Sequence, residues 1–260
     1  MTFNEKTLIV ICGPTASGKT DVSIELAQRF DTHILSCDSR QFYKEIPIVT
    51  AAPDQEQLSL VPHHFIGNKS IQDFYSAGDF EIDALNLLDR LFAEKDCVVM
   101  TGGSGLYIDA VCNGFDAVPD ADLKVRERLN KIYDEHGLGK LLEDLQQRDP
   151  EYYGVVDRNN PQRVIRALEV CISTGHPYSG LRKGNKKERP FRITKFCLDI
   201  PRELLYERIN KRTEIMIENG MVEEARSVFK YKYLNSLQTV GFNELFDFFE
   251  KKTTMLRQWN

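Results

Sequence analysis

The residues best suited to chemistry form a glycine-rich run near the start of the chain, residues 13–20, which reads GPTASGKT. The run fits G-x-x-x-x-G-K-[ST] and lies between an apolar stretch, residues 8–12, and a segment with apolar residues at helical spacing. A glycine-rich loop that opens a helix directs several backbone N–H groups at one anion. The pattern therefore predicts a phosphate-binding loop. Its members are Gly13, Pro14, Thr15, Ala16, Ser17, Gly18, Lys19 and Thr20.

Two side chains of this loop have the chemistry that bound phosphates require. The Lys19 ammonium can neutralise the outer phosphate, and the Thr20 hydroxyl can help to hold a Mg²⁺ ion that bridges phosphate oxygens. The pattern leaves the ligand open between a nucleoside triphosphate and another diphosphate.

A carboxylate is expected close to this loop. Asp38 ends a predicted strand, residues 32–38, and is followed by Ser39, Arg40 and Gln41. Because the carboxyl ends of parallel strands gather at one edge of a sheet, Asp38 is well placed to reach a ligand there. A helix cap or a solvated loop residue is the alternative interpretation of Asp38.

The elements that must position these residues alternate between strand and helix. Residues 8–12, 32–38 and 97–100 are predicted strands, and residues 21–30 and 77–95 have helical periodicity. A glycine-rich turn, TGGSGLY, follows the third strand and is expected to face the phosphate-binding loop. This repetition predicts an α/β fold, a P-loop NTPase-like parallel sheet flanked by helices.

The pattern changes to helices alone between residues 113 and 180. We therefore expect a P-loop catalytic core, residues 1–112 and 181–260, with an inserted all-helical subdomain, residues 113–180. In its third helix Asn159 or Asn160 is a candidate cap, with Pro161 at the first position and Gly175 just past the end.

Basic residues gather in two places. Gln162, Arg163 and Arg166 share one side of the third helix, and residues 180–191 form a run with five basic residues. The second run is expected to be a mobile loop suited to a polyphosphate backbone, and a solvated charged surface is the alternative for both. His63 and His64, in a long connection, are expected on the surface rather than as metal ligands.

Composition limits the class of protein. The 260 residues carry a net charge of −5, which does not itself indicate nucleic-acid binding, and no apolar stretch approaches the roughly 18 residues of a membrane span. The six cysteines contain no C-x-x-C pair, so reduced thiols are expected and a zinc site is not. Nothing near Met1 resembles a signal peptide, and we expect a cytoplasmic, monomeric protein that does not contact membranes.

Six motifs in one order resemble those of the tRNA dimethylallyltransferases, also called isopentenyl-tRNA transferases. They are GPTASGKT, CDSRQFY, AAP with HH, GGSGLY, NPQRVIRALEV and QTVGFNEL, and the similarity spans about residues 7–245. The resemblance implies transfer of a dimethylallyl group from dimethylallyl diphosphate to the N6 amine of the adenosine just 3′ of the anticodon in tRNA. The phosphate-binding loop would then hold the diphosphate of the donor, with Mg²⁺ near Thr20.

The resemblance also assigns roles to residues. Asp38 would accept a proton from the adenine amine, while Lys19, Thr20 and Arg212 would stabilise the leaving diphosphate. Ser104 stands where the family usually has threonine. The helical insertion would contact the anticodon stem-loop. The residues expected to contact tRNA are Asp38, Ser39, Arg40, Gln41, Ser104, Arg126, Gln162, Arg163, Val164, Ile165 and Arg166.

One part departs from the family pattern. The family usually continues into a basic terminal helix, of which the ending KKTTMLRQWN retains only remnants, so weaker RNA affinity or altered packing of the last helices is expected. Two alternatives remain open: a P-loop small-molecule kinase, which would turn over ATP, and an RNA-binding module without catalysis, which would bind tRNA and transfer nothing.

Overall fold

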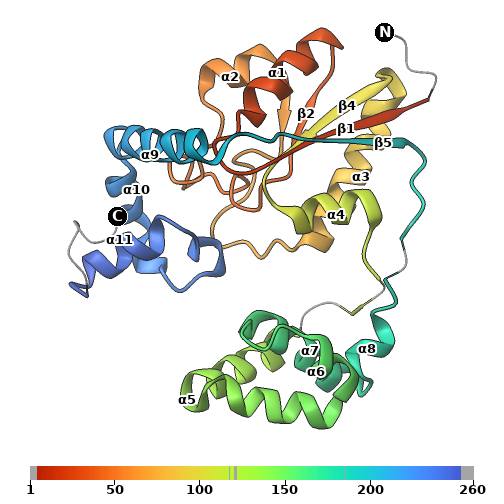
Figure 1. The fold of residues 1–260 in the computed structure, drawn as a ribbon, viewed down its shortest axis with the longest axis vertical. Helices are drawn as coiled ribbons and strands as arrows, with labels where there is room; N and C mark the ends of the chain where they lie inside the picture. Colours follow the sequence, from red (N-terminus) through yellow and green to blue (C-terminus); the bar gives the residue numbers. More distant parts are fainter. Residues whose placement is uncertain (1–4, 117, 120–121, 185, 253–260) are drawn as a thin grey trace. The chain divides into compact units, whose positions relative to one another are not determined.

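The computed structural model describes residues 5–116, 118–119, 122–184 and 186–252 (Figure 1). The chain divides into two compact units, one formed by Met1–Cys112 with Arg189–Asn260 and the other by Asn113–Glu188. The second unit thus runs past the boundary expected at Gly180. Most of the ending compared with the family's terminal helix, residues 253–260, lies outside the described residues.

A five-stranded sheet forms the centre of the first unit. Its strands are β1 (Thr7–Cys12), β2 (Ile34–Ser36), β3 (His63–His64), β4 (Cys97–Thr101) and β5 (Arg192–Cys197). They lie in the order β3-β2-β4-β1-β5, and every pair is parallel. The chain passes from β1 to β2 over β4, so the strand order reverses beside β1, where ligands bind in open α/β sheets. The predicted parallel α/β fold is confirmed.

Both faces of this sheet are covered, because the side chains of a strand alternate between them. Leu8 and Val10 of β1 pack in one hydrophobic cluster with the helices α3 (Ala77–Glu94) and α4 (Gly105–Asn113), and Ile9 and Ile11 pack in another with the helix α1 (Lys19–Arg29). Figure 1 shows these helices on the two sides of the sheet.

The connection between β2 and α3 is more ordered than predicted. It contains the helix α2 (Gln55–Leu60), closed at its start by an Asp54 capping box, and the strand β3. His63 and His64, which were expected on the surface, form β3 and are partly exposed there. Elements this short carry too little periodicity for a sequence pattern to identify.

The last part of the first unit forms a second hydrophobic core. It contains α9 (Arg202–Glu218), α10 (Met221–Val228) and α11 (Phe242–Phe249), with short 3₁₀ turns at Phe229–Tyr231 and Asn235–Leu237. The apolar faces of α10 and α11 pack on the connection between β2 and α3, through Ile46 and Val49 after β2 and Ile71 after β3. Residues of the connection between β2 and α3 therefore belong to this second hydrophobic core.

The second unit is entirely helical in its described residues. Its helices are α5 (Leu123–Arg148), α6 (Pro150–Val155), α7 (Pro161–Thr174) and α8 (Tyr178–Leu181), and Gly137 with φ 76° interrupts α5. Asn160 caps α7, and Gly175 adopts a left-handed conformation just past its end, as predicted. Across the part of the chain that the structure describes, no helix is both long and apolar enough to span a bilayer.

Candidate active site

The phosphate-binding loop follows β1 without a gap. Gly18 caps α1 in a left-handed conformation, with φ 87°, which favours glycine. Gly13 is packed so tightly that a Cβ atom there would lie 2.9 Å from the carbonyl oxygen of Leu198, next to β5. The loop therefore places the first-turn N–H groups of α1 at the carboxyl edge of the sheet.

Lys19 folds back over this loop. Its Nζ donates hydrogen bonds to the carbonyl oxygens of Gly13, at 3.1 Å, and Pro14, at 2.6 Å. Burial lowers the pKa of Lys19, the nearby Arg212 guanidinium lowers it further, and the Asp38 carboxylate opposes both. The protein provides little negative charge to balance the Lys19 ammonium, so this group would attract an anionic ligand.

Three hydroxyl groups near Lys19 suit a phosphate ligand. Ser17 Oγ and Ser23 Oγ are buried and have no hydrogen-bond partner among the described residues, and Thr20 lines the same cleft. A buried hydroxyl without a partner is costly, so a ligand with acceptor oxygens would satisfy it. The site thus has the donors that a diphosphate needs.

Asp38 is held at the end of β2 by its neighbours. The Arg40 N–H donates to Asp38 Oδ1 at 3.0 Å, and the Ser39 N–H donates to Ser104 Oγ at 2.9 Å. Close packing of the glycine-rich turn makes this possible, because a Cβ atom on Gly102 would lie 2.6 Å from the Cys37 carbonyl carbon. Ser104 therefore positions the loop that carries Asp38.

Arg40 and Gln41 anchor other loops around the cleft. The Arg40 guanidinium donates to the carbonyl oxygens of Asn235, at 2.8 Å, and Gln238, at 3.0 Å. The Gln41 amide donates to the carbonyl oxygens of Thr50, at 3.3 Å, and Ala51, at 3.2 Å. Both side chains thus have structural partners, while Gln41 also faces the cleft.

A cleft of about 620 Å³ unites most of the predicted residues of the first unit. The predicted residues that line it are Thr15, Ala16, Ser17, Gly18, Lys19, Thr20, Asp38, Gln41 and Arg212. Gly13, Pro14, Ser39, Arg40 and Ser104 are not among the residues that line it. Burial lowers the pKa of Arg212, and Asp38 opposes that shift.

Arg208 belongs to the same cleft and was not among the predicted site residues. A Cβ atom on Gly18 would lie 3.9 Å from Arg208 Nη1, so this guanidinium lies against the phosphate-binding loop. Arg208 and Arg212 are one turn apart on α9 and share a face. That spacing is the sequence signal that identifies the pair. Other lining residues, such as Gln57 and His63, come from the connection whose structure was not predicted.

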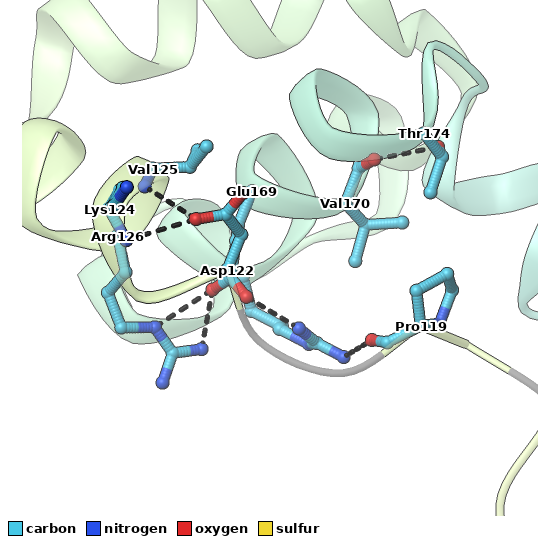
Figure 2. Close-up of polar contacts among 9 residues, drawn as sticks. Pro119, Asp122, Lys124, Val125, Arg126, Glu169, Val170 and Thr174 are labelled. Atoms are coloured by element: carbon cyan, nitrogen blue, oxygen red, sulfur yellow. Dashed lines mark hydrogen bonds and ion pairs between the residues drawn. The ribbon is translucent and has the colours of Figure 1, made fainter.

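In the second unit two predicted arginines share the buried Glu169 carboxylate, and Figure 2 labels Arg126 and Glu169 of this group. Arg126 Nη2 lies 2.6 Å from Glu169 Oε2, and Arg166 Nη1 lies 2.8 Å from Glu169 Oε1. Arg166 also donates to the carbonyl oxygen of Pro119 at 2.6 Å. The Arg126 pair joins α5 to α7, whereas Arg166 and Glu169 both belong to α7, and 31% and 30% of the two arginine side chains remain exposed.

The other predicted contacts in α7 differ in exposure. Gln162 and Arg163 are exposed, whereas Val164 and Ile165 lie in the hydrophobic core of the second unit. The expectation of tRNA contact is corrected for the side chains of Val164 and Ile165, because core packing makes them inaccessible.

The basic run at residues 180–191 is also corrected at one position. Arg189 is buried and pairs with Glu81 at 2.8 Å, and it donates to the carbonyl oxygens of Ala110 and Val111. Its charge therefore holds the end of α4 and does not face a polyphosphate.

Comparisons with known proteins agree on one family. The family model described as IPP transferase matches residues 41–259. "tRNA dimethylallyltransferase 1" of Bacteroides thetaiotaomicron is 49% identical over 244 residues, which cover 94% of this chain and 79% of that protein. The tRNA dimethylallyltransferase of Christiangramia forsetii is 50% identical over 248 residues, covering 95% of this chain and 82% of the relative.

Solved structures show the same similarity. The tRNA isopentenylpyrophosphate transferase of Bacillus halodurans superposes with a TM-score of 0.66 at 31% identity, covering 98% of this chain and 80% of that chain. A eukaryotic dimethylallyltransferase acting on tRNA gives a TM-score of 0.75 at 26% identity, covering 95% of this chain and 64% of that chain.

Proposed function

Because this chain belongs to the IPP transferase family, we infer that it is an enzyme that transfers a dimethylallyl group to tRNA. The named relatives favour this reaction over the phosphoryl transfer of a small-molecule kinase. The observation that carries the assignment is that Lys19, Arg212 and Asp38 line one cleft. The cleft holds cations for a leaving group beside a carboxylate for an incoming amine.

We propose dimethylallyl diphosphate as the donor, bound at the phosphate-binding loop. When the allylic carbon–oxygen bond breaks, negative charge grows on the diphosphate. Lys19 and Arg212 are positioned to stabilise that charge, and Arg208 adds a third cation beside Gly18. The Lys19 ammonium would exchange its bonds to two loop carbonyls for bonds to phosphate oxygens.

Asp38 is proposed to act on the acceptor. Its carboxylate would accept a hydrogen bond from the N6 amine of adenine and then its proton, as the nitrogen attacks the allylic carbon. Arg40 N–H already bonds one carboxylate oxygen, which orients the group. Guanine offers no amine at the equivalent position, so the same contact selects adenine. A single-stranded anticodon loop lets the base leave its stack to reach the cleft.

Mg²⁺ is the proposed metal, near Thr20. Across the part of the chain that the structure describes, no cluster of three or more His, Cys, Asp or Glu side chains has metal-binding geometry. That suits a Mg²⁺ ion that arrives with the diphosphate, because Mg²⁺ at such sites is held largely by phosphate oxygens and water. The Thr20 hydroxyl would supply an oxygen ligand from the protein. When bound, the ion would neutralise charge on the leaving diphosphate.

The target adenosine is proposed to lie just 3′ of the anticodon, with the second unit contacting the anticodon stem-loop. Its exposed Gln162 and Arg163 and the partly exposed edges of Arg126 and Arg166 support this assignment. A monomeric, cytoplasmic enzyme is part of the same proposal.

The test is incorporation of radiolabel from dimethylallyl diphosphate into unmodified tRNA in the presence of Mg²⁺. Label should enter the tRNA and should disappear when the adenosine 3′ of the anticodon is replaced. A parallel reaction with ATP measures any kinase activity. ATP turnover without label incorporation would contradict the proposed function.

A further inference from the structure

Two cysteines lie side by side where β1 ends and the phosphate-binding loop begins. Cys12 and Cys197 are the last residues of β1 and β5, and they are register partners in that parallel pair. Cys197 is exposed, because β5 is an edge strand of the sheet, and Cys12 is partly exposed. Within the described residues, both are free thiols.

The distance between these strands suits a covalent bridge. Neighbouring strands lie about 4.8 Å apart, and disulfides join Cα atoms roughly 4.4–6.8 Å apart. The Cys12 thiol donates to the Phe196 carbonyl oxygen at 3.4 Å, and burial, together with the neighbouring Cys197 thiol, raises the pKa of Cys12. The Lys195 ammonium opposes that shift and favours the thiolate. A bridge would therefore need little movement of the backbone.

The other thiols are protected from solvent. Cys37, Cys97, Cys112 and Cys171 are all buried. Burial raises the pKa of each of these four thiols, and raises that of Cys97 to about 11. An oxidant in solution should therefore reach Cys197 first and Cys12 second.

This pair is directly connected to the diphosphate site. Gly13 follows Cys12, and the Leu198 N–H donates to the Cys12 carbonyl oxygen at 2.8 Å. Gly13 is also the glycine that packs tightly against the Leu198 carbonyl. The Lys19 ammonium bonds the Gly13 carbonyl oxygen. No flexible segment separates Cys12 from the phosphate-binding loop. A change in the backbone geometry at Cys12 should therefore also move this loop.

We propose that Cys12 and Cys197 form a reversible disulfide in exchange with a low-molecular-weight disulfide, and that the bridge weakens diphosphate binding. The Cys197 thiolate attacks one sulfur of the small disulfide and releases one small thiol. The Cys12 thiolate then attacks Cys197 Sγ in the mixed disulfide and releases the second small thiol. Two protein thiols are thus oxidised while one disulfide is reduced to two thiols, and the protons of the protein thiols pass to the released thiolates.

The first experiment maps the bridge in the folded full-length chain. The protein is incubated with oxidised glutathione, remaining thiols are alkylated, and the peptides are analysed by mass spectrometry without reduction. We expect a peptide pair joined through Cys12 and Cys197, which dithiothreitol separates. Full alkylation of both cysteines, or glutathione on Cys197 with Cys12 still alkylated, would overturn the proposal.

The second experiment measures binding of inorganic pyrophosphate with Mg²⁺ by calorimetry, and only this part rests on the proposed function. Displacing one charge-assisted donor should weaken the affinity of the oxidised protein by roughly tenfold. Cys197→Ser should bind like the reduced protein and lose the response to oxidant, whereas Cys171→Ala, in the second unit, should keep it. Equal affinity of the bridged and reduced proteins would overturn the effect on binding. Failure of the reduced protein to bind pyrophosphate would instead count against the proposed function, while the mapped bridge still decides this inference.

Discussion

Neighbouring charges in the cleft shift the pKa values of Lys19 and Arg212. Arg212 lowers the pKa of Lys19, and Asp38 opposes the downward shift at both cations. Lys19 and Arg212 repel each other in a partly buried cleft, so an anion that binds between them lowers the electrostatic energy of both. The same arrangement would serve both the proposed donor binding and the proposed stabilisation of the leaving group.

The titration of Lys19 tests this coupling. Burial and Arg212 should place the pKa of Lys19 below the usual lysine value of about 10.4. Arg212→Gln removes the repelling charge, so the pKa of Lys19 should rise toward that value. The measurement is the ¹³Cε shift of Lys19 against pH by NMR, assigned through Lys19→Arg. An unchanged titration in Arg212→Gln would show that the two cations are not coupled.

At the scale of elements, α10 holds the loop that borders the cleft. The Glu224 carboxylate accepts hydrogen bonds from the Ile48 and Val49 N–H groups, each at 2.8 Å. Burial raises the pKa of Glu224, and these two hydrogen bonds oppose the shift. The loop continues to Ala51 and Ala52, which line the cleft. Glu224 thus connects the second hydrophobic core to the site.

Removing this connection should destabilise the first unit. Glu224→Ala leaves two backbone N–H groups without their acceptor, and we expect a loss of about 2 kcal/mol in unfolding free energy. Because the folded-state pKa of Glu224 is raised, wild-type stability should fall as pH rises through it, and the variant should lack this dependence. Urea unfolding at several pH values measures both.

The matched control is Glu223→Ala, an exposed neighbour on the same helix. It should change stability by less than about 0.5 kcal/mol. Equal losses in the two variants would mean that the charge of an acidic residue in the first turn of α10, and not the contact with the loop, determines the effect.

The sequence predicts an element well when the residues that determine its structure are close together in the chain. The phosphate-binding loop and α7 follow from residues adjacent in the chain, such as Gly18 and Asn160, so both could be predicted. The strand β3 has two residues and exists because it pairs with β2, which no local pattern records. The partners of Arg189 and Glu224 lie far away in the sequence, so their roles were visible only in the fold.

The site residues that were predicted correctly are also those that short local motifs identify. Lys19, Thr20 and Asp38 belong to short motifs, and the structure brings them to one cleft. Val164 and Ile165 were assigned through a motif that mixes exposed and core positions. Helical spacing alone indicates that these two residues are buried and Arg163 is exposed, because only one side of α7 faces solvent.

At the scale of the whole molecule, the second unit should supply affinity for RNA. Arg163→Gln removes an exposed charge, while Arg126 and Arg166 must also maintain the contact with Glu169. If Arg163 contacts a phosphate, the variant should weaken tRNA binding and reduce the slope of log affinity against log salt by about one. Filter binding at several salt concentrations measures this slope.

Lys6→Gln provides the control for that measurement. Lys6 precedes β1 and pairs with Asp96 at 3.0 Å, so it lies at the edge of the sheet opposite the phosphate-binding loop. Its replacement should leave the salt slope unchanged. A slope that is also unchanged in Arg163→Gln would identify that arginine as part of a solvated surface.

The reaction as a whole requires that donor binding and acceptor activation are separate tasks within one cleft. Asp38→Asn tests this most directly, because asparagine keeps an acceptor for the Arg40 N–H and loses the base. We expect label transfer from dimethylallyl diphosphate to tRNA to fall by roughly 10²–10⁴-fold, with donor affinity measured by calorimetry nearly unchanged. Retained transfer, or loss of donor binding together with transfer, would contradict the assignment of Asp38 to the adenine amine.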